Sequence, residues 1–401
     1  MDLFSQRLLN DGVRKREVFG WAMYDFANSG YTTVVLTAVF NAYFVSVVAQ
    51  GAAWGTLAWT IAIAASSLIV MLTLPAIGAY ADLRAAKKRL LGGCTVVCVL
   101  GTAALAGAGP GDLGLAILAV VVSNIAYSYG ESLTAAFLPE LARPEAMGRV
   151  SGWGWSFGYL GGMLALGLGL AYVLSAQARG EPATSFVPVT MLITAATYAL
   201  ASVATFMLLR ERAVPQFIAG RDQAGKVPSS LKSGGWGASF ARLADTWRHA
   251  RQYRDFSWLL ACGACYQAGI SVVVALAAVY AEQALGFKQA DTMLLIFVVN
   301  IAAAGGAFAF GYWQDRIGHK RALSVTLLGW ILMTVLAVLA RGPALFWVAA
   351  MIAGLCMGSS QSAGRAMAGL FTPGDRRAEF FGLWTFATRA SAVLGLLTYG
   401  L

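Results

Sequence analysis

Two stretches of this sequence, GAYADLRAAKKRL at residues 78–90 and GYWQDRIGHKRAL at residues 311–323, decide how the chain is organised. Each stretch follows a long apolar segment, has a glycine four residues before an aspartate, and then continues into a basic cluster. The two aspartates, Asp82 and Asp315, lie 233 positions apart. A repeated motif at such an offset predicts that the chain consists of two halves with the same layout.

Two weaker repeats have similar offsets. NSGYTTVVLTAVF from Asn28 resembles QAGISVVVALAAVY from Gln267, and RPEAMGRVSGWGW from Arg143 pairs with TPGDRRAEFFGLW from Thr372. Three repeats in the same order predict two halves of six helices each, in parallel topology. The stretch 210–255 separates the halves, and we interpret it as a linker because loops of that length are uncommon inside a compact unit.

The composition is that of a membrane protein. Of the 401 residues, 58% are hydrophobic and only 12% are charged, whereas soluble domains have about 25% charged residues. Eleven apolar segments are each about long enough to cross a hydrocarbon core of roughly 30 Å as a helix. They are 18–48, 54–81, 90–108, 113–138, 150–176, 186–209, 256–281, 292–313, 322–340, 344–370 and 380–401. The sequence therefore predicts an all-α polytopic membrane protein, with bundles at 1–209 (six helices) and 256–401 (five helices).

The basic residues predict the orientation. Of the 29 Lys and Arg residues, 24 lie at the N-terminus or in every second connection, and two lie inside spans. The remaining three lie on the other side, at Arg179, Lys288 and Arg341. The positive-inside rule then predicts a cytoplasmic N-terminus, a cytoplasmic linker, and a place in the cytoplasmic membrane. The net charge of +10 thus reflects topology, and we expect a lipid bilayer and no nucleic acid as the partner.

The repeated loop resembles the signature of the major facilitator superfamily, whose members have two six-helix halves joined by a cytoplasmic loop. The first copy keeps Gly78 and Asp82 but has Leu83 where the signature has Arg. The second copy is complete, with Gly311, Asp315, Arg316, Gly318, Lys320 and Arg321. An aspartate at a helix end can pair with Arg or Lys and cap a neighbouring helix N-terminus. We interpret the motif as a clamp on the outward-facing state; the alternative is a loop that only sets topology.

A finer resemblance is to the vacuole-effluxer branch of that superfamily, the autophagy-related group with a fungal vacuolar amino-acid exporter. Three blocks carry it: WAMYDFANSGYTTVVLTAVFNAYF from Trp21, FLPELARPEAMGRVSGWGWSFGYLGG from Phe137, and GDRRAEFFGLWTFATRASAVLG from Gly374. The resemblance implies solute export, with amino acids among the candidates. Members usually have twelve helices, whereas this chain ends at Leu401 in the eleventh, so a twelfth is either missing from the sequence or dispensable. Ala268 stands where members often have an acidic residue, so an ion-coupling role is not carried over to it.

Four charged residues fall inside apolar segments at one depth. Asp25, Glu131, Arg365 and Arg389 lie about 12–15 Å from the cytoplasmic ends of their helices. A charge at the bilayer centre costs about 2.5–3.5 kcal/mol on insertion scales, and such residues usually have a role. We therefore predict one water-filled cavity between the halves. Asp25 or Glu131 is also a candidate proton carrier, because desolvation disfavours the charged form of a carboxylate.

Neighbouring polar residues extend these faces by helical spacing. They are Asn28 and Tyr31 near Asp25, Asn124 and Tyr127 on the helix of Glu131, and Gln361 one turn from Arg365. Because the acids lie in the first half and the bases in the second, a zwitterion held across the interface would fit. A set of interhelical salt bridges without a substrate role would fit equally well.

Other motifs do not indicate catalysis. Gly154, Ser156 and Gly158 form G-x-S-x-G, but no histidine is near, and the spacing with Gly162 favours close helix packing. The five cysteines lie in apolar helices, so we expect buried thiols and no metal site. In the linker, Phe240, Leu243 and Trp247 predict an interfacial amphipathic helix, with a solvated linker as the alternative.

The sequence as a whole predicts a monomeric secondary active transporter without a cofactor, which exports a small polar solute by alternating access with proton coupling. An exporter of another organic solute or drug is the alternative within transporters. A transporter-like scaffold or receptor, and a lipid-modifying membrane enzyme, are the alternatives from other classes; no catalytic set supports the last.

Overall fold

The computed structural model describes residues 5–215, 246, 250–287 and 289–400. Within these ranges the regular structure is helical, apart from one isolated bridge between Leu9 and Ala142. Ten described helices are long and apolar enough to cross a membrane, and α15 (Arg377–Gly400) is a further long helix. The predicted all-α membrane fold is confirmed, whereas the predicted linker helix over Phe240, Leu243 and Trp247 lies outside the described residues.

The first bundle begins with a long, irregular helix. After the turn η1 (Gln6–Leu8), α1 (Lys15–Tyr31) continues through the π-helical stretch η2 (Thr32–Ala38), α2 (Phe40–Tyr43) and a second π-helical stretch, η3 (Phe44–Val48). Thr32 and Thr33 both donate side-chain hydrogen bonds to the carbonyl of Ser29, at 3.0 and 2.9 Å. Side-chain hydroxyls that bond to backbone carbonyls compete with regular helix hydrogen bonds, which accounts for a change of helix type at this point.

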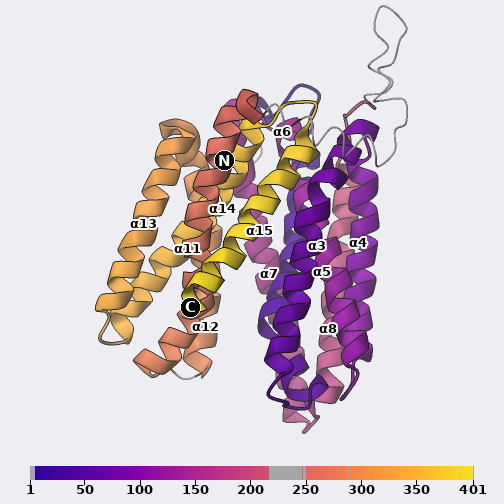
Figure 1. Cartoon of the computed structure of the whole chain (residues 1–401), viewed down its shortest axis with the longest axis vertical. Helices are drawn as coiled ribbons and strands as arrows, with labels where there is room; N and C mark the ends of the chain where they lie inside the picture. Colours follow the sequence, from indigo (N-terminus) through magenta and orange to yellow (C-terminus); the bar gives the residue numbers. More distant parts are fainter. Residues whose placement is uncertain (1–4, 216–245, 247–249, 288, 401) are drawn as a thin grey trace, which may run out of the picture.

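The other helices of the first bundle follow in order. They are α3 (Gly55–Arg84), α4 (Lys87–Ala104) with η4 (Leu105–Gly107), α5 (Leu113–Ala135), the short α6 (Leu138–Leu141), η5 (Pro144–Ala146), α7 (Met147–Ala178) and α8 (Ala183–Leu208). The second bundle holds η6 (Ala250–Tyr253), α11 (Arg254–Leu285), α12 (Gln289–Ile317), α13 (His319–Leu339), α14 (Pro343–Phe371) and α15. The two bundles stand side by side and come together around α6, α7, α14 and α15 (Figure 1).

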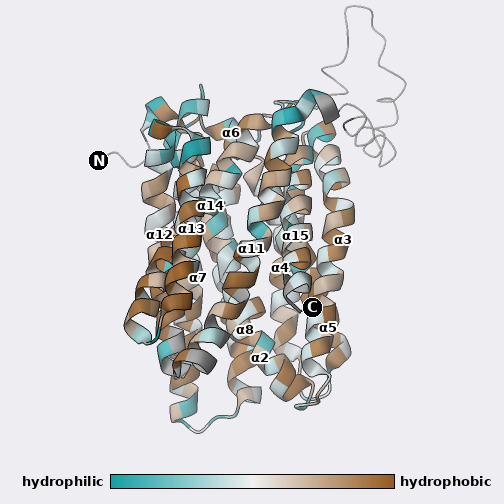
Figure 2. Cartoon of the chain, turned by 60° about the vertical axis from the view of Figure 1, so that its left-hand side comes forward, coloured by the Kyte–Doolittle hydropathy of each residue, from teal (hydrophilic) through white to brown (hydrophobic). Residues whose placement is uncertain are grey.

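The outer surface is apolar along the helices. Leu72, Leu200 and Val338 are 66%, 73% and 74% exposed, and exposed hydrophobic side chains in such number mark a surface that faces something other than water. Hydrophilic residues gather near α6 (Figure 2). We call this end the basic end; it carries residues 84–89, 143–149, 316–321 and 376–377.

The two bundles contact each other closely at the basic end through small residues. Gly78 of α3 lies against the backbone of Ala378 in α15, and Gly148 of α7 lies against Gly311 of α12. A Cβ atom added to Gly78 would overlap the carbonyl group of Ala378. Because small residues let helix backbones approach, these two contacts, one at each copy of the repeated motif, hold the basic end closed.

We expect Gly78→Ala to open the basic end, because the added methyl group meets backbone atoms that cannot move alone. Spin labels at Arg89→Cys and Ser324→Cys, in a background without native cysteines, measure the separation of the bundles there. The longer-distance population should rise several-fold. Gly93→Ala is the matched control, since nothing lies within 4 Å of its added Cβ. Identical distance distributions for the two variants would contradict the prediction.

Candidate functional site

An ion pair joins the two bundles in the interior. Arg365 of α14 donates through Nη1 to Asp25 Oδ2 of α1 at 2.6 Å, and the side chains are 8% and 12% exposed. Asp25 lies ten residues beyond Lys15, about 15 Å along α1. Arg365 also donates to Ser151 of α7, through Nε to Oγ at 3.2 Å and through Nη2 to the carbonyl oxygen at 2.8 Å. The guanidinium group is therefore held by three hydrogen bonds.

Two indole rings pack against the same guanidinium group. The Arg365 Cζ atom lies 4.8 Å from the ring centroid of Trp21 and 5.2 Å from that of Trp155. Such contacts stabilise a cation by about 0.5–2 kcal/mol, more when the group is desolvated. Arg365 thus lies in a preformed, largely dry setting that would also suit it for binding a carboxylate.

Glycines of α7 make room for this arrangement. A Cβ atom at Gly158 would lie 2.9 Å from Ser29 Oγ, and one at Gly162 would lie 2.9 Å from Thr33 Oγ1. Gly154 lies directly against the Asp25–Arg365 pair. The predicted close-packing role of these glycines is confirmed, and their spacing of four places all three on the face that contacts α1.

A second, looser pair lies between α15 and α5. Arg389 Nη2 donates to Ser128 Oγ at 2.8 Å and lies 3.8 Å from Glu131 Oε2. The side chain of Glu131 is 37% exposed and that of Arg389 is 21% exposed, while the buried Nε atom of Arg389 has no hydrogen-bond partner within the described part of the chain. The structure thus brings the predicted acids and bases together in two pairs that differ in tightness.

The remaining predicted residues are divided between the interface and the first bundle. Gln361 accepts a hydrogen bond from Tyr159 across the bundles, and Tyr127 stacks on Tyr31 at 5.3 Å between centroids. Three side chains bond inside the first bundle: Asn28 to Tyr198, Tyr31 to Ser123, and Asn124 to Ser66. Because the two asparagines are 5% and 2% exposed, contact with a solute would require these hydrogen bonds to open.

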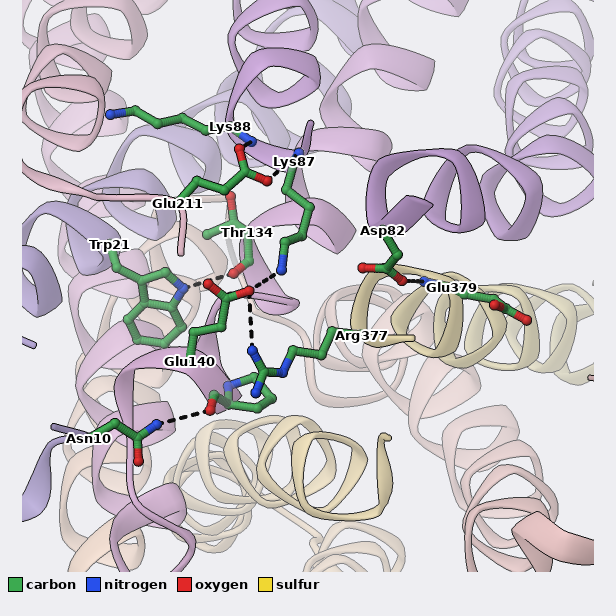
Figure 3. A network of polar contacts seen from close by, with 11 residues as sticks. Asn10, Trp21, Asp82, Lys87, Lys88, Thr134, Glu140, Glu211, Arg377 and Glu379 are labelled. Carbon is green, nitrogen blue, oxygen red and sulfur yellow. Dashed lines mark hydrogen bonds and ion pairs between the residues drawn. The ribbon is translucent and has the colours of Figure 1, made fainter. Parts of the chain in front are cut away.

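The motif aspartates cap helices of the opposite bundle. Asp315 accepts from the backbone N–H groups of Gly148 and Arg149 at 2.8 and 3.1 Å, and from the Arg149 side chain at 3.0 Å. Asp82 accepts from the N–H of Glu379 at 3.0 Å (Figure 3). A carboxylate at a helix N-terminus satisfies free donors and complements the helix dipole. Each bond therefore stabilises closure of the basic end.

The other motif residues have different positions. Arg316, Lys320 and Arg321 are exposed, so the cation that pairs with Asp315 comes from α7 and not from its own loop. Gly318 has a φ of +91° in the short turn between α12 and α13. That conformation favours glycine, which explains the residue without a functional role.

A third polar group, not predicted from the sequence, surrounds Glu140. Its Oε1 atom pairs with Lys87 of α4 and lies 3.4 Å from Arg377 Nη1 of the other bundle (Figure 3). Glu211 caps α4 by accepting from the N–H groups of Lys87 and Lys88 at 2.7 and 3.0 Å. Burial raises the pKa of the Glu211 carboxyl, although these N–H groups lower it in part. Charges are ordinary at the ends of membrane helices, so nothing in the sequence distinguished Glu140.

The described residues contain no group of three or more His, Cys, Asp or Glu that could hold a metal ion. Cys94 and Cys98 of α4 and Cys356 are buried or half-buried, whereas Cys262 and Cys265 are exposed. The expectation that all thiols are buried was therefore wrong for these last two, because no described element covers their face of α11.

The family model described as "Vacuole effluxer Atg22 like" matches residues 57–401. The chain belongs to this family. The transporter is 28% identical over 384 residues to the uncharacterized MFS-type transporter YxiO of Bacillus subtilis, covering 94% of this chain and 86% of that protein. It is 23% identical over 300 residues to autophagy-related protein 22 of Yarrowia lipolytica, covering 70% of this chain and 50% of that protein.

Solved structures of transporters share the fold of this chain. The human organic anion transporter MFSD10 matches with a TM-score of 0.71 and 13% identity, over 96% of this chain and 92% of that one. The proton:xylose symporter XylE matches with a TM-score of 0.68 and 16% identity, over 96% and 87%. The chain is a multi-pass membrane transporter of the major facilitator superfamily that acts on small-molecule solutes, and it is not an enzyme.

We expect Asp315→Asn to slow transport more than it weakens solute binding, because the aspartate caps α7 at the basic end and lies away from the Asp25–Arg365 pair. Hydrogen bonds to a charged group are worth about 1.5–3 kcal/mol, so the maximal rate should change by about tenfold or more. Flux in proteoliposomes and affinity on the same purified protein test this. Asp375→Asn, a carboxylate at the same end that is 64% exposed, is the control. Normal turnover with lost binding would contradict the clamp role.

Proposed function

We propose that this transporter moves a small polar solute across the cytoplasmic membrane by alternating access, and that amino acids are the first class to test. The observation that carries the proposal is the Asp25–Arg365 pair, with 12% and 8% of the side chains exposed, which joins the bundles in the interior. A buried ion pair is often no more stabilising than apolar residues of similar size. Its retention at this depth therefore supports a role in binding.

The two pairs offer complementary charges to a zwitterion. The solute carboxylate would compete with Asp25 for Arg365, which the two indoles and Ser151 keep in place. The ammonium group would bind Asp25 or the partly exposed Glu131, whose separation of 3.8 Å from Arg389 leaves its carboxylate available. Solute binding would thus break contacts between the bundles and replace them with contacts of its own, which is the differential interaction that a change of state requires.

The same exchange would allow proton coupling. Once the solute carboxylate takes Arg365 and its ammonium group binds Glu131, Asp25 stands without a cation in a desolvated site, and a carboxylate in that position binds a proton. Release of the solute restores the ion pair and expels the proton. Proton uptake and solute binding would then occur together, so a pH gradient would drive the solute.

The closed basic end supports a proposal for the side of the membrane from which the site is reached in this state. The distribution of Lys and Arg favours a cytoplasmic basic end and N-terminus, so the site would be reached from the opposite side. Opening towards the cytoplasm would require the Asp82 and Asp315 caps to break. The family description, vacuole effluxer, favours movement of the solute out of a compartment. Because the proton would move with the solute, a pH gradient would drive export only where it drives protons in the same direction. We propose a monomer as the working unit.

One observation favours a second candidate class. Arg365 between Trp21 and Trp155 would bind a carboxylate whether or not an ammonium group is present, so organic anions are the alternative to amino acids. A thermal-shift screen of amino acids, peptides and organic anions on purified protein, followed by flux with and without a pH gradient, separates these classes. Absence of flux for every stabilising compound would instead favour a scaffold or receptor.

We expect Asp25→Asn to keep the protein folded and to abolish pH-dependent flux, because the amide oxygen can still accept from Arg365, which Ser151 and two indoles also hold, but does not carry the proton. Melting temperature and flux per folded molecule are measured on one preparation. Asp112→Asn, in an exposed loop of the same bundle, is the control. A structural latch would behave in the opposite way, since removal of one partner of a buried pair costs roughly 3–5 kcal/mol. Low stability with intact flux would exclude the proposed role.

A further inference from the structure

Trp21 contacts both the interior ion pair and the basic end. It lies on α1, four residues before Asp25, and is fully buried. The face of its ring lies against the guanidinium group of Arg365, 4.8 Å from Cζ to the centroid. Its Nε1 atom donates to the carbonyl oxygen of Thr134 at 2.8 Å (Figure 3).

Thr134 marks a break in a helix. The helix α5 ends at Ala135 and α6 begins at Leu138, and Pro139 cannot donate the hydrogen bond that would continue α5. The Thr134 carbonyl accepts from Phe137 N–H at 3.1 Å and from Trp21. The indole therefore holds the end of α5 where the chain turns into α6.

The short helix α6 in turn contacts the other bundle. Glu140 of α6 lies 3.4 Å from Arg377 at the start of α15 and also pairs with the buried Lys87. Pro139 lies beside Gly369 of α14, where an added Cβ would be 3.2 Å from the proline ring. The position of α6 thus determines whether these contacts at the basic end form.

We propose that Trp21 is a positioning residue that couples the state of Arg365 to the closure of the basic end. The indole is rigid and has only two side-chain torsions, so a rotation that follows Arg365 also moves Nε1 away from Thr134. Displacement of Arg365 from Asp25 would loosen the end of α5, shift α6 and weaken the Glu140–Arg377 contact. The inference rests on the proposed function, for which it supplies the link between solute site and gate.

Trp155 provides a matched control. Its ring lies 5.2 Å from the same guanidinium carbon, but its buried Nε1 atom has no hydrogen-bond partner among the described residues. Trp21 and Trp155 therefore make similar contacts with Arg365, and of the two only the indole N–H of Trp21 bonds to Thr134.

The test measures coupling between Asp25 and Glu140 and needs no solute. Spin labels at Arg89→Cys and Ser324→Cys give the ratio of open to closed basic ends for Asp25→Asn, Glu140→Gln and the double variant. Effects of distant sites without shared partners multiply in such a ratio. We expect the open-to-closed ratio of the double variant to differ by about fivefold or more from the product of the two single-variant effects; we call this difference the departure.

The same cycle is then repeated in two backgrounds. With Trp21→Phe, which keeps an aromatic ring but lacks the donor, the departure should fall below about twofold. With Trp155→Phe it should persist. If Trp21→Phe does not fold, Trp21→Met, which fills the space without a donor, should give the same loss.

Multiplicative effects in the protein with Trp21, or an unchanged departure after Trp21→Phe, would overturn the proposal. Loss of the departure with Trp155→Phe would also overturn it, since contact with Arg365 alone would then explain the coupling. The readout of this test is a distance, whereas the proposed transport function is tested by flux. Failure of the coupling and failure of the transport function can therefore be told apart.

Discussion

The arrangement of the interior depends on the need to compensate one buried guanidinium group. Arg365 is 8% exposed, and an uncompensated charge in such a setting costs several kcal/mol. Asp25, Ser151 and two indoles meet that need from the other bundle, and the glycines of α7 let α1 come close enough to do so. The packing of α1, α7 and α14 is thus organised around a charge that binds the two bundles together.

The basic end is closed by contacts of a different kind. Glycines let α3 approach α15 and α7 approach α12, and at each crossing an aspartate of one bundle caps a helix of the other. These contacts consist of close packing and a few hydrogen bonds, which a modest rotation would remove together. The contact between Glu140 and Arg377 adds a third connection between the bundles. It depends on the break between α5 and α6, which places Glu140 on the short helix α6.

Trp21 contacts both of these regions, Arg365 in the interior and the end of α5 at the basic end. Solute binding in the interior would influence a gate at the basic end only if some element has two arrangements for which the two sites have different preferences. The end of α5 is suited to that role, because the helix breaks there just before Pro139, and the Thr134 carbonyl accepts both from Phe137 N–H and from a side chain of α1.

Much of this protein could be predicted from its sequence. Hydropathy and the internal repeat determine a helical membrane protein with two similar bundles, because membrane helices must satisfy their backbone internally and be apolar outside. The same constraint made Asp25, Glu131, Arg365 and Arg389 conspicuous, since a charge inside an apolar segment is rare. Only the tertiary structure decided which acid meets which base, that Asn28 and Asn124 bond within their own bundle, that Ser151 and Trp21 contact Arg365, and that Glu140 lies beside Arg377. These contacts depend on how the helices rotate and cross, which is set by packing between segments far apart in the chain. The periodicity of the sequence records only which residues share a face of one helix.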